Sequence, residues 1–157
     1  MSLPPSLSIL TRRQVEGEIL KPVYAILKER FGETTAKEII GQAIIKVAKE
    51  TGRQMAAKVG GGTLANFIKI QELWRANDAL KVDVLAETPE RFDYNVTHCA
   101  YATLYQSLGL GDLGFILSCD RDGAFIEGFN PKIKMTRSQT LMEGAPFCDF
   151  RYRLTKA

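Results

Sequence analysis

Eight polar or sulfur-containing side chains in the second half of the chain are of the types that carry out chemistry. They are His98, Cys99, Cys119, Asp122, Arg137, Gln139, Cys148 and Asp149. They supply an imidazole, thiols, carboxylates, an amide and a guanidinium, which serve in enzymes as nucleophiles, general bases and substrate anchors. We therefore expect the chemistry of this protein in the part of the chain from His98 to Leu154.

Arg137 is the most informative of these residues because its position conflicts with its charge. In a strand that holds Ile133 and Met135, alternation places Arg137 on the same face as these apolar side chains. A buried guanidinium is costly unless an anion pairs with it. Asp122, Asp149 or a ligand carboxylate could supply that anion. The alternative is a β-bulge before Arg137, which would return the side chain to solvent.

Alternation predicts the same inward direction for three further candidates. Gln139 has the parity of Arg137, and Cys148 has the parity of the aromatic residues in its own strand. His98 likewise shares its parity with the aromatic residues that precede it. The pattern thus predicts that three strands bring Arg137, Gln139, Cys148 and His98 to the face that the helices cover.

Cys99 is a candidate nucleophile. If Thr97 caps the following helix, Cys99 lies in the first helical turn, where unpaired N–H groups and the helix dipole favour a thiolate. The adjacent His98 is a candidate general base because an imidazole titrates near neutral pH. The alternative for Cys99 is the commoner role of a small, buried apolar residue.

Asp122 is a candidate partner for a positive charge. It lies three positions after Cys119 on a predicted helix, so the two side chains share one face. The carboxylate could pair with Arg137 or hold a cationic ligand. The alternative is an ordinary solvated charge.

Motifs for metal and phosphate chemistry are missing. His98 and the three cysteines could form a zinc set, but no C-x-x-C pair occurs, so the spacing does not favour a metal. The glycine run before Thr63 lacks the Lys-Ser/Thr ending of a phosphate-binding loop. Neither G-x-S-x-G nor H-E-x-x-H is present. We expect no metal and no cofactor.

The first half of the chain must fold as helices to position these groups. Apolar residues recur at helical spacing from Thr11 to Phe31, and Pro22 should kink or split that helix. A second helix is predicted after Thr35, which has Glu38 three positions on, as in a capping box. A run of three glycines ends it, and Thr63 can cap a third helix.

The second half changes to the period of a strand. Alternation predicts strands at 80–84, 92–96, 133–135 and 147–154, with helices near 101–108 and 113–125. Local strand neighbours favour antiparallel pairing. The sequence therefore predicts an α+β fold with amino-terminal helices packed on an antiparallel sheet. We expect a single domain over 1–157, helical at about 8–77, with sheet and site at about 79–155.

Composition excludes several classes of protein. The 157 residues carry a net charge of +3 and no block of basic residues, so a nucleic-acid surface is not indicated. No apolar run approaches the ~18 residues of a membrane span, and the first ten residues do not resemble a signal peptide. An odd count of three cysteines then predicts free thiols in a reducing cytoplasm. A homo-oligomer stays open.

Specific stretches of the second half resemble a known family. They read T-H-C-A-Y-A, then S-C-D-R-D, then G-F-N-P-K-I-K-M-T-R-S-Q-T-L-M-E-G-A-P-F-C-D-F-R-Y-R. This pattern, from about Val96 to Arg153, resembles the L-2-amino-thiazoline-4-carboxylic acid hydrolase family. Gly144, Cys148 and Phe150 are similar, more loosely, to small-molecule-binding domains related to bacteriochlorophyll 4-vinyl reductase.

The resemblance implies a hydrolase that opens a small C–N/C–S heterocycle such as 2-amino-thiazoline-4-carboxylate to N-carbamoyl-cysteine. Such a reaction needs a carboxylate anchor, for which Arg137 is suited, and an anion for the amidine-like end, for which Asp122 or Asp149 is suited. Cys99 attack and direct attack by water, with His98 as base, both stay open. The alternative function is a non-enzymatic small-molecule-binding domain of the 4-vinyl reductase type.

Overall fold

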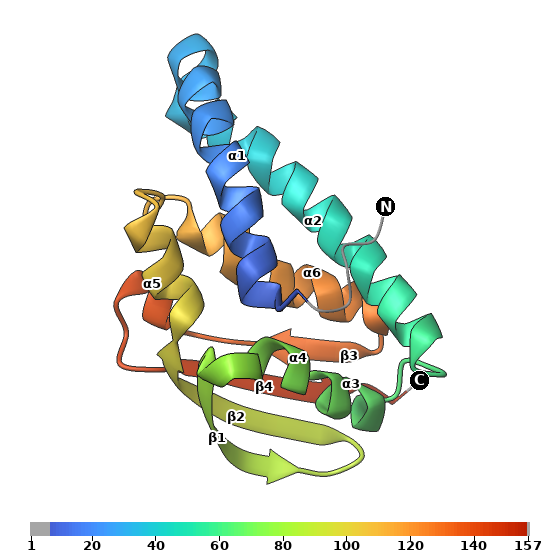
Figure 1. Ribbon diagram of the computed structural model, residues 1–157. Helices are drawn as coiled ribbons and strands as arrows, with labels where there is room; N and C mark the ends of the chain where they lie inside the picture. Colours follow the sequence, from blue (N-terminus) through green and yellow to red (C-terminus); the bar gives the residue numbers. More distant parts are fainter. Residues whose placement is uncertain (1–6, 157) are drawn as a thin grey trace.

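Four antiparallel strands form one sheet, and helices cover one of its faces in the computed structural model, which describes residues 7–156 (Figure 1). The order across the sheet is β1-β2-β4-β3, so the last strand lies between the second and the third. The strands are β1 (Leu80–Glu87), β2 (Arg91–Cys99), β3 (Ile133–Thr136) and β4 (Cys148–Leu154). The predicted α+β class with an antiparallel sheet is confirmed.

Helices fill the first half and the connection between β2 and β3. The first half contains α1 (Ile9–Phe31), α2 (Glu33–Lys58), α3 (Leu64–Ile70), α4 (Glu72–Arg75) and the 3-10 turn η1 (Ala76–Asp78). The second half contains α5 (Ala100–Ser107), the π-helical turn η2 (Phe115–Cys119), α6 (Asp120–Phe129) and the 3-10 turn η3 (Leu141–Glu143). No helix within residues 7–156 has the length and apolar composition needed to cross a membrane.

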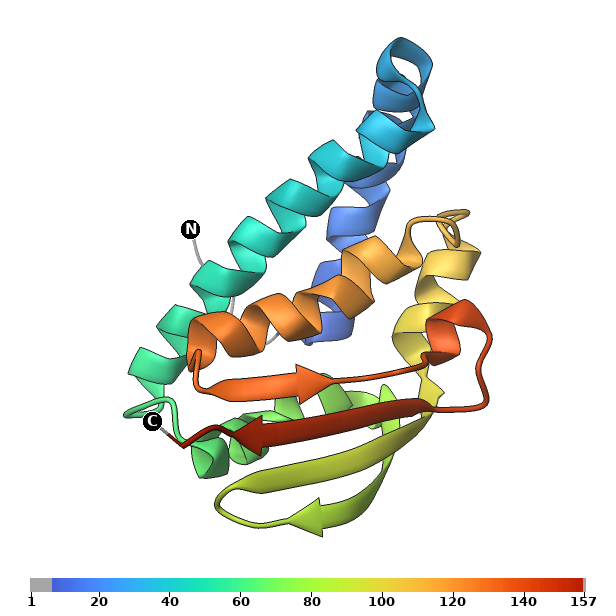
Figure 2. The same ribbon diagram turned by 180° about the vertical axis from the view of Figure 1, so that it is seen from behind.

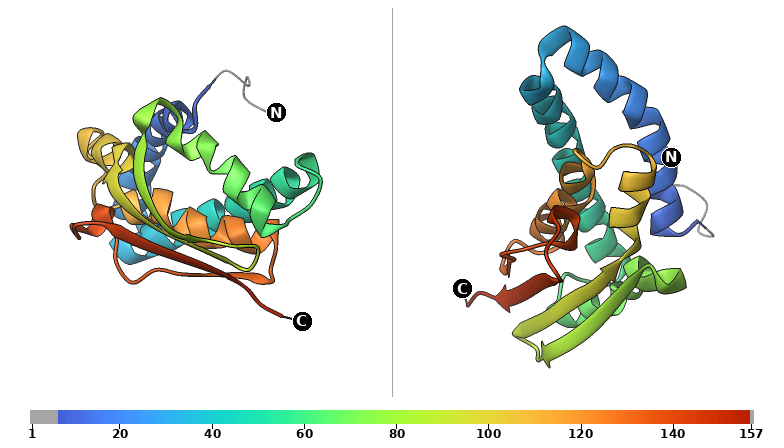
Figure 3. Two further views of the ribbon diagram at one scale, coloured as in Figure 1. Left: turned by 90° about the horizontal axis from the view of Figure 1, so that it is seen from below. Right: turned by 90° about the vertical axis from the view of Figure 1, so that its left-hand side faces the viewer.

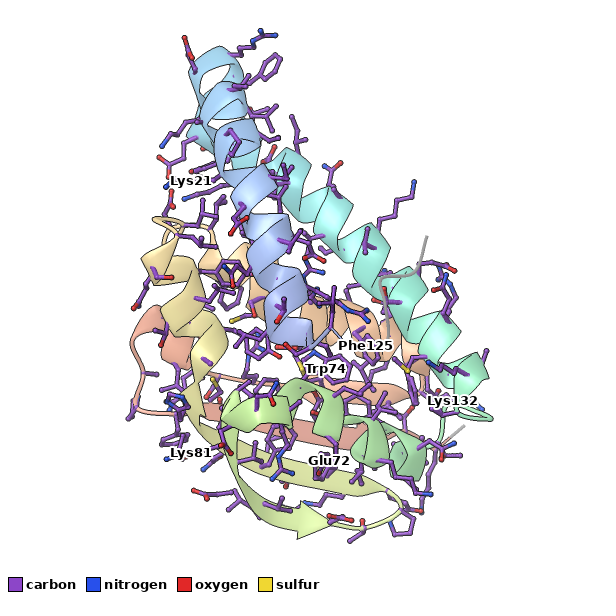
Figure 4. The ribbon with its side chains drawn as sticks, viewed as in Figure 1. Lys21, Glu72, Trp74, Lys81, Phe125 and Lys132 are labelled. Atoms are coloured by element: carbon purple, nitrogen blue, oxygen red, sulfur yellow. The ribbon has the colours of Figure 1, made fainter. Side chains whose placement is uncertain are left out.

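Aromatic side chains join the sheet to α3 and α6. Phe67 from α3 packs on Tyr152 from β4 and on Phe129 from α6, with ring centroids 4.9 and 5.7 Å apart. Trp74 from α4 meets Phe125 from α6 edge-on at 5.1 Å (Figure 4). Alternating apolar residues of the strands thus face one layer of helices, as the strand pattern predicts.

Glycines allow α2 to cross α6 at very short range (Figure 2). A Cβ atom on Gly52 would lie 2.2 Å from the carbonyl oxygen of Phe125, and one on Gly128 would lie 2.0 Å from that of Lys49. No larger residue fits at either position, because both neighbours are backbone. This crossing fixes α6, the helix that carries Asp122.

The helices α1 and α2 form a hairpin that extends from the sheet (Figure 1; Figure 3, right). A second apolar cluster, separate from the sheet core, packs against the half of the hairpin nearer to its turn and includes Tyr24, Ile40 and Leu117. Helix α1 continues through Pro22, which is exposed, so the predicted split does not occur.

The start predicted for the second helix is wrong by three residues. The turn between the two helices is Gly32 alone, with φ of 84°, a conformation that glycine adopts without steric cost. Glu33 begins α2 directly after it, so Thr35 lies inside the helix and does not cap it. Thr63, in contrast, caps α3 as predicted: its Oγ1 accepts from the backbone N–H of Asn66 at 3.1 Å.

Candidate functional site

Arg137 and Asp122 form an ion pair beneath the helical layer. The Arg137 guanidinium donates to Asp122 Oδ2 at 2.9 Å and to the carbonyl oxygen of Cys119 at 3.3 Å. The rings of Phe115 and Phe150 lie 5.6 and 5.1 Å from the same guanidinium. Only 7% of the Arg137 side chain is exposed. Of the three anions that the sequence leaves open for Arg137, Asp122 is the one that pairs with it in the structure.

Contrary to the prediction from alternation, Arg137 does not lie in a strand. Strand β3 ends at Thr136, so Arg137 and Gln139 lie on the connection to β4 and not in a longer strand. The side chain of Arg137 nevertheless points inward, because the carbonyl oxygen of Cys119 and the carboxylate of Asp122 receive it there. No bulge returns it to solvent.

A π-helical turn prepares the acceptors for the buried arginines. In η2 the helix is wider than an α-helix, which leaves carbonyl oxygens free for side chains. The Leu117 carbonyl accepts from Nε of Arg121 at 2.5 Å, and the Cys119 carbonyl accepts from Arg137. The turn therefore holds two guanidinium groups at the start of α6.

Asp122 combines partial exposure with a strongly altered acidity. Its side chain is 31% exposed, although protein surrounds it on most sides. Burial raises the pKa of Asp122 to about 6, against the opposing charges of Arg137, Arg13 and Arg121, which lower it. A carboxylate that water can reach and that titrates near neutral pH is suited to accept a proton.

All three cysteines are free thiols whose pKa values are raised. Burial raises the pKa of Cys99 to about 11, even though the N–H groups of Ala102 and Tyr101 favour the thiolate. Burial also raises the pKa of Cys119 and of Cys148. These environments stabilise neutral thiols, which are weak nucleophiles.

Cys99 lies two positions earlier relative to its helix than predicted. It is the last residue of β2 and the residue that precedes α5, with extended backbone angles. Thr97 is inside the strand and does not cap α5. The first-turn position that would have favoured a thiolate is therefore not occupied by Cys99.

The prediction that His98 faces the core is wrong. Lys81 in β1 pairs with His98, but the next residue, Val82, pairs with Val96, so Thr97 is an extra residue in β2. Such a bulge reverses the side-chain direction beyond it. His98 is exposed as a result, while Cys99 lies partly buried against the core.

Asp149 and Gln139 organise the connection between β3 and β4. The Asp149 carboxylate accepts from the backbone N–H groups of Ser138 and Gln139, each at 2.9 Å, and from Ser138 Oγ at 2.5 Å. The amide of Gln139 donates to the carbonyl oxygen of Phe147 at 3.0 Å. Cys148 Sγ accepts from the N–H of Leu141 at 3.2 Å. The structure thus places these residues around the Arg137 connection, with contacts to its backbone.

A second ionic cluster, which the sequence analysis did not identify, joins α1 to α6. Glu16 from α1 accepts from Arg121 of α6 at 2.8 Å and from Arg13 at 3.1 Å. We call these three residues the Glu16 cluster. Arg121 is almost fully buried, and burial lowers its pKa to about 10. The available sequence signal was a basic residue between two aspartates at the start of the helix.

Other sites receive less support from the structure. Among residues 7–156, no group of three or more His, Cys, Asp and Glu side chains is placed to hold a metal ion. A surface hollow of about 570 Å³ lies near Gly62, Asn130 and Leu154. It sits at the far end of β4 from Cys148, away from the Asp122–Arg137 pair.

Comparisons with solved structures show the same fold at very low sequence identity. The phenol-responsive sensory domain of the transcription activator PoxR, solved with phenol, has a TM-score of 0.55 and 8% identity, covering 88% of this chain and 74% of that one. A trafficking protein particle complex subunit 3 from Naegleria fowleri, covalently bound to palmitic acid, has a TM-score of 0.50 and 10% identity, covering 91% and 97%.

Sequence comparison identifies the family. No curated protein sequence matches the chain. The family model described as L-2-amino-thiazoline-4-carboxylic acid hydrolase matches residues 12–152. That range includes most of the α1–α2 hairpin, the Asp122–Arg137 pair and all of the sheet except the last two residues of β4. The chain therefore belongs to the L-2-amino-thiazoline-4-carboxylic acid hydrolase family.

Proposed function

We propose that this protein hydrolyses a small cyclic isothiourea of the 2-amino-thiazoline-4-carboxylate type, with Asp122 as the general base. The observation that carries the proposal is the state of Asp122. It is a carboxylate reachable by water, held in place by a buried arginine, with a pKa raised to about 6. At neutral pH most of it is ionised and ready to accept a proton.

The reaction follows from this placement. The amidine-like end of the substrate carries positive charge and is attracted to the Asp122 carboxylate. Asp122 accepts a proton from a water molecule as the water oxygen bonds to the ring carbon between sulfur and nitrogen. The new hydroxyl group then becomes the carbonyl of the product and releases its proton to solvent, while the C–S bond breaks and the sulfur takes the proton from Asp122. The positively charged substrate and one water thus give N-carbamoyl-cysteine and one proton.

The geometry favours direct attack by water over attack by a cysteine. The raised pKa of Cys99, about 11, keeps this thiol neutral at physiological pH. His98 lies on the outside of the bulge in β2 and is exposed, so it is not positioned to activate Cys99. Asp122 is the remaining candidate base with a pKa in the useful range.

Arg137 is proposed as a positioning residue for Asp122. Its two faces are covered by Phe115 and Phe150, and its donors already engage Asp122 and a carbonyl oxygen. This arrangement fixes the direction of the carboxylate. The contact of Arg137 with a substrate carboxylate, expected from the sequence, stays a prediction.

The test is turnover of 2-amino-thiazoline-4-carboxylate by the purified protein. Release of a thiol is followed with a thiol-reactive dye, and N-carbamoyl-cysteine is identified by mass spectrometry. We expect turnover by the wild-type chain, retention in His98→Gln and loss in Asp122→Asn. A folded wild-type protein without turnover, or an Asp122→Asn variant with full activity, would overturn the assignment.

A binding function without catalysis is the second candidate. It is favoured by the two solved structures of the same fold, whose descriptions name bound phenol and covalently bound palmitic acid. Under this alternative the wild-type chain binds the substrate analogue but releases no thiol. The same turnover experiment, together with a binding measurement, separates the two functions.

A further inference from the structure

The Glu16 cluster has a net positive charge, because it contains two guanidinium groups and one carboxylate. Glu16 is shared by the guanidinium groups of Arg13 and Arg121. Only NH1 of Arg13 is engaged, so its other nitrogens donate to no side chain or backbone atom within residues 7–156. Nε of Arg12, the residue directly before Arg13, is buried without a hydrogen-bond partner in the same range. Buried positive charge of this kind is costly unless an anion joins it.

The cluster adjoins Asp122 along α6, because Arg121, which contacts Glu16 at 2.8 Å, directly precedes Asp122 in that helix. The Glu16 cluster and the Asp122–Arg137 pair together contain three guanidinium groups, from Arg13, Arg121 and Arg137, but only two carboxylates.

We propose that the Glu16 cluster is the subsite for the carboxylate of the ligand, with Arg13 as the residue that binds it. This inference rests on the proposed function, because it names the second half of the same site. The ligand class is a small molecule that carries a carboxylate at one end and an amidine-like group at the other. Its carboxylate takes the place of the Glu16 side chain, which is 37% exposed and can turn outward, so that it pairs with Arg13 and keeps an anion beside Arg121. Its other end meets Asp122.

This assignment divides the arginines by role. Arg121 has its Nε bound to the Leu117 carbonyl and an NH2 bound to Glu16, so it supports the subsite from below. Arg137 holds Asp122. Arg13, on the helix that covers the region, has donors to spare, and a guanidinium offers two parallel N–H groups to a carboxylate.

Binding of three aromatic analogues, which resist ring opening, tests the subsite by calorimetry. They are 2-aminothiazole-4-carboxylate, 2-aminothiazole, which lacks the carboxylate, and thiazole-4-carboxylate, which lacks the amino group. In the wild-type chain we expect the carboxylate to improve affinity by roughly 10- to 100-fold, the range for a charge-assisted pair. Arg13→Gln should abolish this gain and leave 2-aminothiazole binding unchanged. Arg53→Gln, an exposed arginine on α2, is the matched control.

A second variant distinguishes an effect on the subsite from a folding defect. Glu16→Gln removes the carboxylate that competes with the ligand, so affinity for both carboxylate analogues should rise by roughly 3- to 10-fold. Loss of folding cannot produce such a gain.

The results also separate this inference from the proposed reaction. Equal wild-type affinity with and without the carboxylate, no binding of either analogue, or a carboxylate preference that survives Arg13→Gln would each overturn the subsite. Absence of turnover, together with a carboxylate preference that Arg13→Gln abolishes, would overturn only the proposed hydrolase activity and would support the subsite.

Discussion

An aspartate pairs with arginine on each side of the sheet: Asp93 in β2 on the open side and Asp122 in α6 on the side that the helices cover. The two aspartates differ in acidity. On the open face, Asp93 accepts from Arg91 at 2.7 Å and from Arg153. Hydrogen bonds and charges from these arginines overcome burial and lower its pKa. On the helix-covered face, Asp122 has Arg137 as its hydrogen-bonded partner, and burial raises its pKa to about 6. The same pair of residue types thus produces opposite acidities.

The difference teaches that the pKa of each carboxyl group depends on how deeply the group lies in the protein rather than on how much of its side chain contacts water. Only 2% of the Asp93 side chain is exposed, yet the two arginines that cover it are themselves about half exposed. Solvent lies directly beyond them. Asp122 is 31% exposed, but its partner Arg137 is only 7% exposed and lies against the rings of Phe115 and Phe150. A deep carboxylate that water reaches is suited to chemistry, whereas a shallow one clamped by two arginines is suited to stability.

Replacing each aspartate by asparagine is the sharpest way to break this comparison. Asp122→Asn should lower ring-opening activity by roughly 10²- to 10⁴-fold, the range for a general base. Asp93→Asn should leave activity within about threefold and lower the free energy of unfolding by roughly 1–2 kcal/mol, because it weakens charge-assisted hydrogen bonds. Steady-state kinetics and urea unfolding check the pair. Equal activity losses in both variants would remove the functional distinction.

The two arginine partners should differ in their effect on stability. Arg137→Met leaves a deep carboxylate without its closest cation, and we expect a loss of about 3 kcal/mol in the free energy of unfolding. Arg153→Met removes a half-exposed partner while Arg91 remains, so the loss should be about 1 kcal/mol or less. Urea titration at neutral pH measures both. If Arg153→Met proves the more harmful change, the outer pair is the stronger one.

The pH dependence of the two aspartates should have opposite signs. Because the folded chain holds the proton on Asp122 more tightly, its contribution to stability is present below pH 3.8 and is lost as pH rises toward about 6. For Asp93, whose pKa is lowered, the contribution is present above its unfolded value and is lost as pH falls through the folded one.

Two profiles can be measured for this prediction. Wild-type kcat/KM should rise with pH through about 6 and then level off, because the base must be ionised. Between pH 4 and 7.5, the unfolding free energy of the wild type should fall relative to that of Asp122→Asn as pH increases. A flat kcat/KM profile between pH 5 and 7 would contradict the role of Asp122.

The smallest expected effect concerns the thiols. Cys99→Ala should change kcat/KM by less than about threefold, because a thiol with a pKa near 11 is neutral in the pH range of the reaction. Iodoacetamide should correspondingly modify the native protein slowly at pH 7, with mass spectrometry as the readout. Rapid alkylation of Cys99 accompanied by inactivation would point to nucleophilic attack by this cysteine instead of by water.

Much of the fold follows from local pattern in the sequence. Alternation in 80–84 and 92–96 predicts the first two strands, helical spacing predicts α1, and Thr63 marks the start of α3. These features depend on neighbours a few residues apart, so the chain displays them directly. The conflict between the charge of Arg137 and its apolar surroundings also appears in the sequence. It indicated a need for an anion, with Asp122 as one of three candidates, and the structure shows Asp122 as the partner.

The tertiary structure alone decided the remaining features. The direction of His98 depends on how β2 pairs with β1, because the extra residue at Thr97 exists only relative to the partner strand. The Glu16–Arg121 contact joins residues 105 positions apart, and no local pattern specifies it. The acidity of Asp122 likewise depends on burial by elements from both halves of the chain. The sequence determined which residues could react; packing decided which of them meet, and at what depth.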